Sequence, residues 1–122
     1  MTVTKGFLNS TVKLLDKYLK ENRRGGCVHT DNSFATYSQL DDDSVYIEDI
    51  YVTPGLRMYH LATKLADHIS RIARSRGCTY LVGSVDKSSP DTDTSRSVLV
   101  AYGMTEWKQD DYFIYFRKRL DG

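Results

Sequence analysis

Hydrophobic residues recur along this chain at two different spacings, and each spacing predicts an element. Near the start they recur every three or four residues, which predicts an amphipathic helix over about residues 5–22, ended by Arg23-Arg24-Gly25-Gly26. Two short runs follow, Cys27–Thr30 and Phe34–Tyr37, and the turn-forming residues 31–33 separate them. This pattern predicts a β-hairpin and therefore the first strands of a sheet.

The stretch from Val45 to Ala62 joins a strand-like run to the start of a helix. Its first part is rich in β-branched and aromatic residues up to Val52, and Pro54-Gly55 then breaks the pattern. Leucines and isoleucines at helical spacing continue from there toward Gly77 and predict a second amphipathic helix. Such a junction directs free backbone N–H groups and the positive end of the helix dipole to one place, where phosphate groups bind well.

The run Tyr80–Val85 is short, apolar and bounded by turn residues, so it predicts a strand parallel to the one before the helix. A strand, a crossover helix and a parallel strand form a βαβ unit. Ligands of open α/β sheets bind at the carboxyl ends of such strands. The junction at Pro54-Gly55 lies at that edge.

The C-terminal third predicts a helix and a second hairpin. Residues Ser95–Tyr102 are expected to form a short helix, with Asp91, Asp93 or Thr94 as N-cap and Gly103 as its stop. Trp107 and the run Tyr112–Phe116 predict two antiparallel strands around residues 108–111.

Composition and charge narrow the class of protein. The chain has 122 residues with 17 basic and 16 acidic side chains, which fits a single domain over residues 1–122. The near balance of charge provides no overall field toward nucleic acid or an anionic membrane, which leaves a local basic patch as the alternative. No apolar run approaches the ~20 residues of a membrane span and no signal-peptide pattern is present, so a cytoplasmic location is expected. Cys27 and Cys78 are then expected to be free thiols.

The acidic run Asp41-Asp42-Asp43 is expected to form a solvated turn, because three consecutive side chains of an extended segment cannot converge on one ion. No metal site is predicted.

The order helix, hairpin, strand, helix, strand, helix, hairpin resembles the GNAT superfamily of acyl-coenzyme A-dependent N-acyltransferases. The resemblance covers about residues 36–120 and is strongest at Tyr51-Val52-x-Pro54-x-x-Arg57, the following helix and the Gly103-Met104 step into the last hairpin. It implies an α/β (α+β) fold with a mixed central sheet of about six strands, about three flanking helices and a central parallel βαβ unit.

The resemblance also implies a binding site for acetyl-coenzyme A as co-substrate. In that family the strand-to-helix turn carries Arg or Gln-x-x-Gly-x-Gly or Ala, whose backbone amides hold the pyrophosphate. Here Arg57 and Ala62 occupy the first and last positions, His60 takes the middle glycine position and Met58 follows the arginine. His60 either adds a donor to the phosphate or is a helix-start histidine with no ligand. The implied binding residues are Ile50, Tyr51, Val52, Arg57, Met58, Tyr59, His60, Leu61 and Ala62.

Acetyl transfer to an amine needs a base, and Glu48 is the candidate. Strand alternation would place it on the same face as Tyr46, Ile50 and Val52, where apolar neighbours would raise the pKa of its carboxyl. Some family members have a catalytic Glu at the matching position. The alternative is a solvated or ion-paired Glu at a strand edge.

Members of the family often have a Tyr that acts as general acid toward the leaving thiolate, about four residues before the Gly-Phe step. That position holds Leu99 in this chain, so the nearby Tyr102 is the candidate acid.

Two functions follow from these observations. The resemblance implies an N-acetyltransferase for an amine-bearing small molecule or protein, with a homodimer formed through the last hairpin. The alternative is a catalytically inactive binding or regulatory protein of the same fold, acting through protein or nucleic-acid contacts such as the arginines at 71, 74 and 76.

Overall fold

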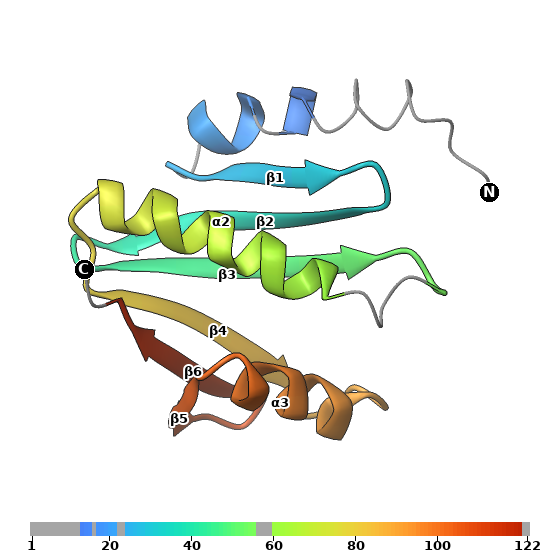
Figure 1. The fold of residues 1–122 in the computed structure, drawn as a ribbon. Helices are drawn as coiled ribbons and strands as arrows, with labels where there is room; N and C mark the ends of the chain where they lie inside the picture. Colours follow the sequence, from blue (N-terminus) through green and yellow to red (C-terminus); the bar gives the residue numbers. More distant parts are fainter. Residues whose placement is uncertain (1–12, 16, 22–23, 56–59, 121–122) are drawn as a thin grey trace.

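A computed structural model describes residues 13–15, 17–21, 24–55 and 60–120 (Figure 1). Residues 13–15 and 17–21 are helical, in agreement with the helix expected there; the rest of that expected helix lies outside the described residues. The elements that follow are β1 (Gly26–Thr30), β2 (Ser33–Asp41), β3 (Ser44–Val52), α2 (Leu61–Ser75), β4 (Tyr80–Asp86), α3 (Thr92–Ala101), β5 (Thr105–Gln109) and β6 (Phe113–Arg119).

The strands form one six-stranded sheet in the order β1-β2-β3-β4-β6-β5. Neighbouring strands are antiparallel except for β3 and β4, which are parallel and are connected by α2. The predicted mixed sheet and its central βαβ unit are therefore confirmed.

The helices α2 and α3 lie on the same face of the sheet, where residues of both line one small pocket. The buried face of α2 contributes Leu65, Ile69 and Ala73 to a core that also contains Val45 and Phe116. Figure 1 shows α2 lying across β2 and β3, while α3 lies beside the half of the sheet formed by β4, β6 and β5. The two helices thus cover different halves of the sheet.

The strands β3 and β4 are paired only at their starts. The paired residues are Ser44 with Tyr80, Val45 with Leu81 and Tyr46 with Val82, although both strands continue beyond them. Figure 1 shows the two strands diverging from that end. The central parallel pair therefore opens toward the carboxyl ends of its strands.

A β-bulge interrupts β3 in the same region. On β2, the consecutive residues Thr36 and Tyr37 pair with Asp49 and Ile47, so Glu48 is the additional residue on β3. A bulge reverses the alternation of side chains along the strand that carries it.

Several element boundaries differ from the sequence expectation, among them the end of β2, the start of α3 and the turn between β5 and β6. The third helix begins at Thr92 rather than Ser95, with Asp91 as its N-cap residue, because the Thr92 hydroxyl donates to the carbonyls of Asp86 and Ser89 and fixes the helix start. Residues 108 and 109 belong to β5, and the turn into β6 forms at Asp110, whose carboxylate accepts N–H bonds from Tyr112 and Phe113.

Asp41 ends β2, and the exposed Asp42 and Asp43 form the tight connection to β3, where the Asp41 carboxylate accepts the N–H of Asp43. Among the described residues, no group of three or more acidic, histidine or cysteine side chains is arranged to hold a metal ion. No helix in the described ranges is both long and apolar enough to cross a membrane.

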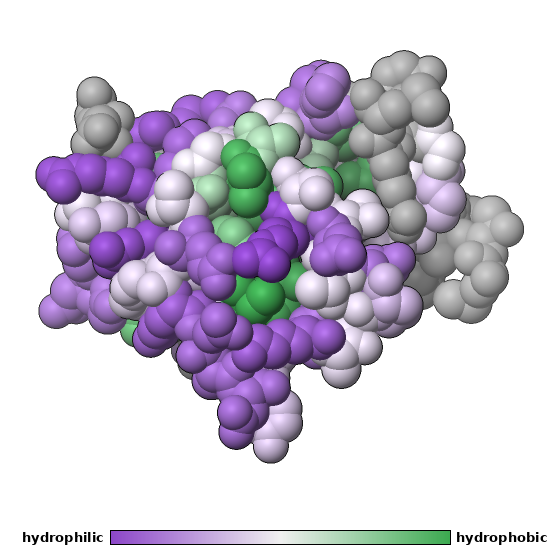
Figure 2. Space-filling view, turned by 90° about the horizontal axis from the view of Figure 1, so that it is seen from below, coloured by the Kyte–Doolittle hydropathy of each residue, from purple (hydrophilic) through white to green (hydrophobic). Residues whose placement is uncertain are grey.

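Figure 2 views the molecule from the side of α3, β5 and β6 and shows a largely hydrophilic surface with a small hydrophobic area at its centre.

Candidate functional site

A cleft of about 540 Å³ lies where β3 and β4 diverge. One wall is β3 from Ile47 to Val52 together with Ala62 of α2, and the other is β4 with α3. The residues on the second wall are Gly83, Ser84, Val85, Asp91, Thr94, Ser95, Val98 and Leu99. The cleft thus opens at the carboxyl ends of the parallel strands, the place that the βαβ unit predicts for a ligand.

Two adjacent acidic residues, Glu48 and Asp49, lie in the part of β3 that lines this cleft, at the β-bulge. Burial raises the pKa of the Asp49 carboxyl above its ordinary value, and the charge of Glu48 adds to that effect. A raised pKa makes a carboxylate a better proton acceptor. Sequence reasoning missed Asp49, although two consecutive acidic residues inside an apolar strand are a signal that could have drawn attention to it.

The expected alternation around Glu48 is wrong. Ile47 and Ile50 both line a second, smaller pocket against α2, so these two residues share a face although they are three positions apart. The bulge at Glu48 causes this shift. Tyr46, the neighbour of Ile47, and Ile50 therefore lie on opposite faces of β3, not on one face as period-two alternation predicted.

A side-chain hydrogen bond joins the two strands where they begin to diverge. The Tyr46 hydroxyl on β3 lies 2.5 Å from the Ser84 hydroxyl on β4. This bond connects the two walls just beyond the last paired residues, Tyr46 and Val82.

The amino end of α2 reaches the edge of the cleft through Ala62. His60 is the N-cap residue and adopts a left-handed backbone with φ of 57° and ψ of 27°, and its side chain makes no capping hydrogen bond. Left-handed backbone is the conformation that favours glycine, and His60 stands at the middle glycine position of the resemblance. Arg57, Met58 and Tyr59 lie outside the described residues.

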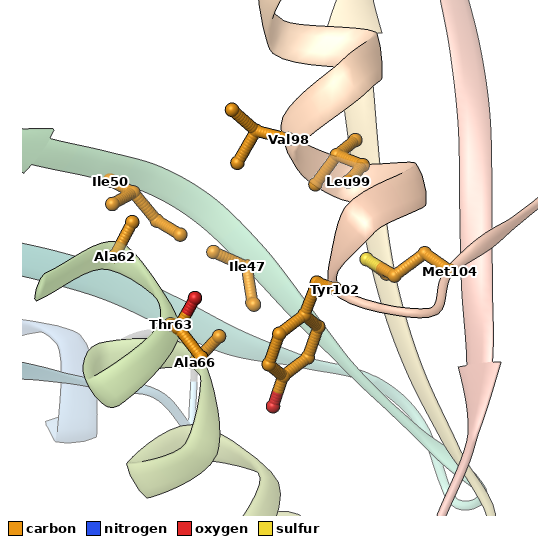
Figure 3. A pocket seen from close by; sticks show the side chains of 9 residues that line it. All are labelled: Ile47, Ile50, Ala62, Thr63, Ala66, Val98, Leu99, Tyr102 and Met104. Atoms are coloured by element: carbon orange, nitrogen blue, oxygen red, sulfur yellow. The ribbon is translucent and has the colours of Figure 1, made fainter. Parts of the chain in front are cut away.

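Tyr102 occupies the smaller pocket, between α2 and α3 (Figure 3). Its hydroxyl donates to Asp67 Oδ1 over 2.6 Å and lies 3.2 Å from Ser70 Oγ. Burial, and then the bond to Asp67, raise the pKa of Tyr102 to about 12. The structure thus directs this hydroxyl to α2. Leu99, which stands at the position of the family's tyrosine, is among the residues that line both the smaller pocket and the larger cleft.

Of the residues expected at the site, Glu48, Ile50, Tyr51, Val52 and Ala62 lie together along one cleft. Leu61 follows His60 as the first residue of α2. Tyr102 lies outside the lining of that cleft.

The model of the acetyltransferase (GNAT) family matches residues 7–96, well over half of the chain. No curated protein sequence matches the chain significantly. Many solved structures share its fold.

One of these structures is an IAA acetyltransferase from Bacillus cereus ATCC 14579, with 14% identity, a TM-score of 0.68, and coverage of 98% of this chain and 97% of that one. Another is a GNAT family acetyltransferase from Elizabethkingia anophelis with acetyl-CoA bound, with 14% identity, a TM-score of 0.68, and coverage of 88% and 82%.

Nourseothricin acetyltransferase shares 20% identity with a TM-score of 0.65. The match covers 74% of this chain and 58% of the nourseothricin enzyme, so the chain spans little more than half the length of that relative. At these identities the structures show a shared fold. The bound acetyl-CoA in one of them agrees with the co-substrate expected from the sequence.

Proposed function

Because the chain belongs to the acetyltransferase (GNAT) family, we propose that it transfers an acetyl group from acetyl-CoA to an amine of a small molecule or a protein. The observation that carries this proposal is the cleft between β3 and β4, with two carboxylates at the bulge of β3.

The shape and lining of the cleft support acetyl-CoA as the co-substrate. Its long, slender arm needs a narrow channel, and the diverging strands supply one that runs past Ile50 and Val52 on one side and Leu99 on the other. The amino end of α2 lies at the mouth of this channel and offers backbone N–H groups to a phosphate. The residues present therefore fit the group.

Glu48 and Asp49 supply the proton acceptor. An amine is protonated near neutral pH and must lose a proton before its lone pair can attack. Both residues belong to the strand that lines the cleft, which supports either one as the acceptor of that proton, directly or through a water molecule. We propose Glu48 as the base, with Asp49 as the second residue to test because its pKa is raised.

Acetyl-CoA supplies the thioester that the neutral amine attacks. The backbone N–H groups of β3 that face the cleft beyond Tyr46 are suited to hydrogen-bond the thioester oxygen, where negative charge develops. The diverging strands thus bring a proton acceptor and backbone donors to the same place.

A thermal melt with acetyl-CoA tests binding. A ligand at 100 times its Kd stabilises a protein by about 2.7 kcal/mol, which corresponds to a rise in Tm of roughly 10 °C for a chain of this size. An unchanged Tm at millimolar acetyl-CoA would contradict the proposal.

Turnover against a panel of amines then tests the base. Glu48→Gln is expected to lower kcat by roughly 100-fold while the Tm shift with acetyl-CoA is retained. Asp49→Asn provides the parallel measurement, and Asp111→Asn, in the turn between β5 and β6, is the matched control. Full turnover by Glu48→Gln together with loss in Asp49→Asn would assign the base to Asp49.

A further inference from the structure

The helix α3 is weakly anchored for an element that forms one wall of the cleft. None of its residues is buried, and of its apolar side chains only Leu99 is half-buried against the core. Five residues of this segment nevertheless line the cleft: Asp91 at the N-cap, and Thr94, Ser95, Val98 and Leu99 within the helix. Something other than apolar burial has to fix the position of this helix.

Tyr102, directly after α3, supplies such a connection. Its hydroxyl donates to Asp67 on α2 over 2.6 Å, with Ser70 of the same helix at 3.2 Å. Lys118 of β6 donates to the Tyr102 carbonyl over 3.1 Å, and its Nζ lies 4.2 Å from the centre of the tyrosine ring. The end of α3 is therefore bonded both to α2 and to the sheet.

This connection crosses the divergence between the strands. Along the chain α2 follows β3 and α3 follows β4, so the bond from Tyr102 to Asp67 joins the two strand–helix units that form opposite walls of the cleft. Figure 3 shows the Tyr102 ring reaching from α3 toward Ala66 on α2. The pocket that both helices line together with Ile47, Ile50 and Met104 has a volume of about 20 Å³, room for roughly one water molecule.

We propose that Tyr102 is a positioning residue, whose hydrogen bond to Asp67 holds α3 against α2 and so sets the width of the cleft. This inference rests on the proposed function, and it assigns Tyr102 a role in binding the acetyl-CoA arm rather than in proton transfer. When the bond is removed, the wall formed by α3 moves more freely and acetyl-CoA binds less tightly.

The test uses four variants of the full chain. Tyr102→Phe removes the donor and keeps the ring, and Asp67→Ala removes the acceptor. Asp67→Asn keeps an acceptor oxygen and is the rescue variant. Tyr112→Phe is the matched control, since it removes a hydroxyl from a tyrosine that is 73% exposed.

Two readouts are measured. Amide hydrogen exchange of α3 without ligand is expected to accelerate roughly tenfold in Tyr102→Phe and Asp67→Ala, while Asp67→Asn and Tyr112→Phe exchange as wild type. The Kd for acetyl-CoA, from calorimetry, is expected to rise roughly three- to tenfold in the first two variants, with a matching rise in KM and little change in kcat.

Unchanged exchange of α3 in Tyr102→Phe would overturn the proposal, and so would an Asp67→Asn variant that behaves as Asp67→Ala. A fall in kcat without a change in KM would overturn it as well, because that result indicates proton transfer by Tyr102. The exchange measurement needs no ligand, so failure of wild type to bind acetyl-CoA would contradict the proposed function and leave the test of the helix connection valid.

Discussion

Replacement of His60 by glycine should make this protein more stable, although it removes a whole side chain. His60 adopts a left-handed backbone at the start of α2, and its side chain makes no capping hydrogen bond. An L-residue in this conformation is strained by roughly 1–2 kcal/mol because its Cβ crowds the following carbonyl. Glycine has no such strain, but it loses roughly 0.5–1 kcal/mol more conformational entropy on folding.

The difference between these two effects gives the expected magnitude. His60→Gly should raise the free energy of unfolding by about 0.8 kcal/mol at the centre of the two ranges and by at most about 1.5 kcal/mol, and the Tm by roughly 3 °C for a chain of 122 residues. The measurement is urea denaturation followed by circular dichroism, with a thermal melt alongside.

His60→Ala is the control because it removes the imidazole and keeps the Cβ. If strain at the Cβ is the cause, alanine should leave stability at or below that of wild type. A glycine variant less stable than wild type, or an alanine variant as stable as the glycine variant, would refute the reasoning. If acetyl-CoA binds at this end of α2, the glycine variant should also bind it more tightly, since phosphate approaches a backbone without a Cβ more closely.

Three further predictions concern stability. A Cβ at Gly25 would overlap the carbonyl oxygen of Tyr37, whereas a Cβ at Gly77 would meet open space and be strained only by the φ of 77°. Urea denaturation should therefore show that Gly25→Ala lowers the free energy of unfolding by about 3 kcal/mol. Gly77→Ala should lower it by only about 1 kcal/mol. The pKa of Asp49 is raised in the folded protein, so stability should fall as the pH rises from about 3.8 through the folded pKa; Asp49→Asn should lack this fall, and parallel pH profiles of the two proteins would contradict the prediction. The pKa of Asp110 is lowered by N–H bonds from Phe113 and Tyr112, so its contribution should be present above about 3.8 and lost as the pH falls through the folded pKa; Asp110→Ala should be less stable than wild type at pH 7 and converge with it in acid, and a constant difference across that range would argue against the assignment.

The parts of the fold that sequence predicted depend on local patterns. The strand ending at Val52, the break at Pro54-Gly55 and the run Tyr80–Val85 were predictable because β-branched residues and turn residues mark their ends. The start of α3 was not, because the polar residues between Thr92 and Arg96 have no apolar periodicity.

The details of the site depend on contacts between distant segments. The bulge at Glu48 arises from the register of β3 against β2, which no local pattern in β3 records. The partner of Tyr102 is Asp67, 35 residues earlier in the chain, and only the packing of α3 beside α2 brings them together. Sequence therefore predicted the edge of the sheet where the cleft lies and one of the two acidic residues on the strand that lines it, while the bulge and the contacts of Tyr102 required the structure.

The limited pairing of β3 with β4 has a consequence for how the molecule responds to stress. The antiparallel strands β1, β2 and β3 form one block and β4, β6 and β5 form another. In the described sheet the two blocks meet in three registered residue pairs at one end, with backbone bonds to the Asp43 carbonyl and the Tyr46–Ser84 bond beside them. A sheet divided in this way has a seam, and heat or mechanical load is expected to separate the blocks there before either one unravels. A ligand bound across this seam would contact both blocks and hold them together. The resistance of the two blocks to separation is therefore expected to increase with the fraction of molecules that have ligand bound.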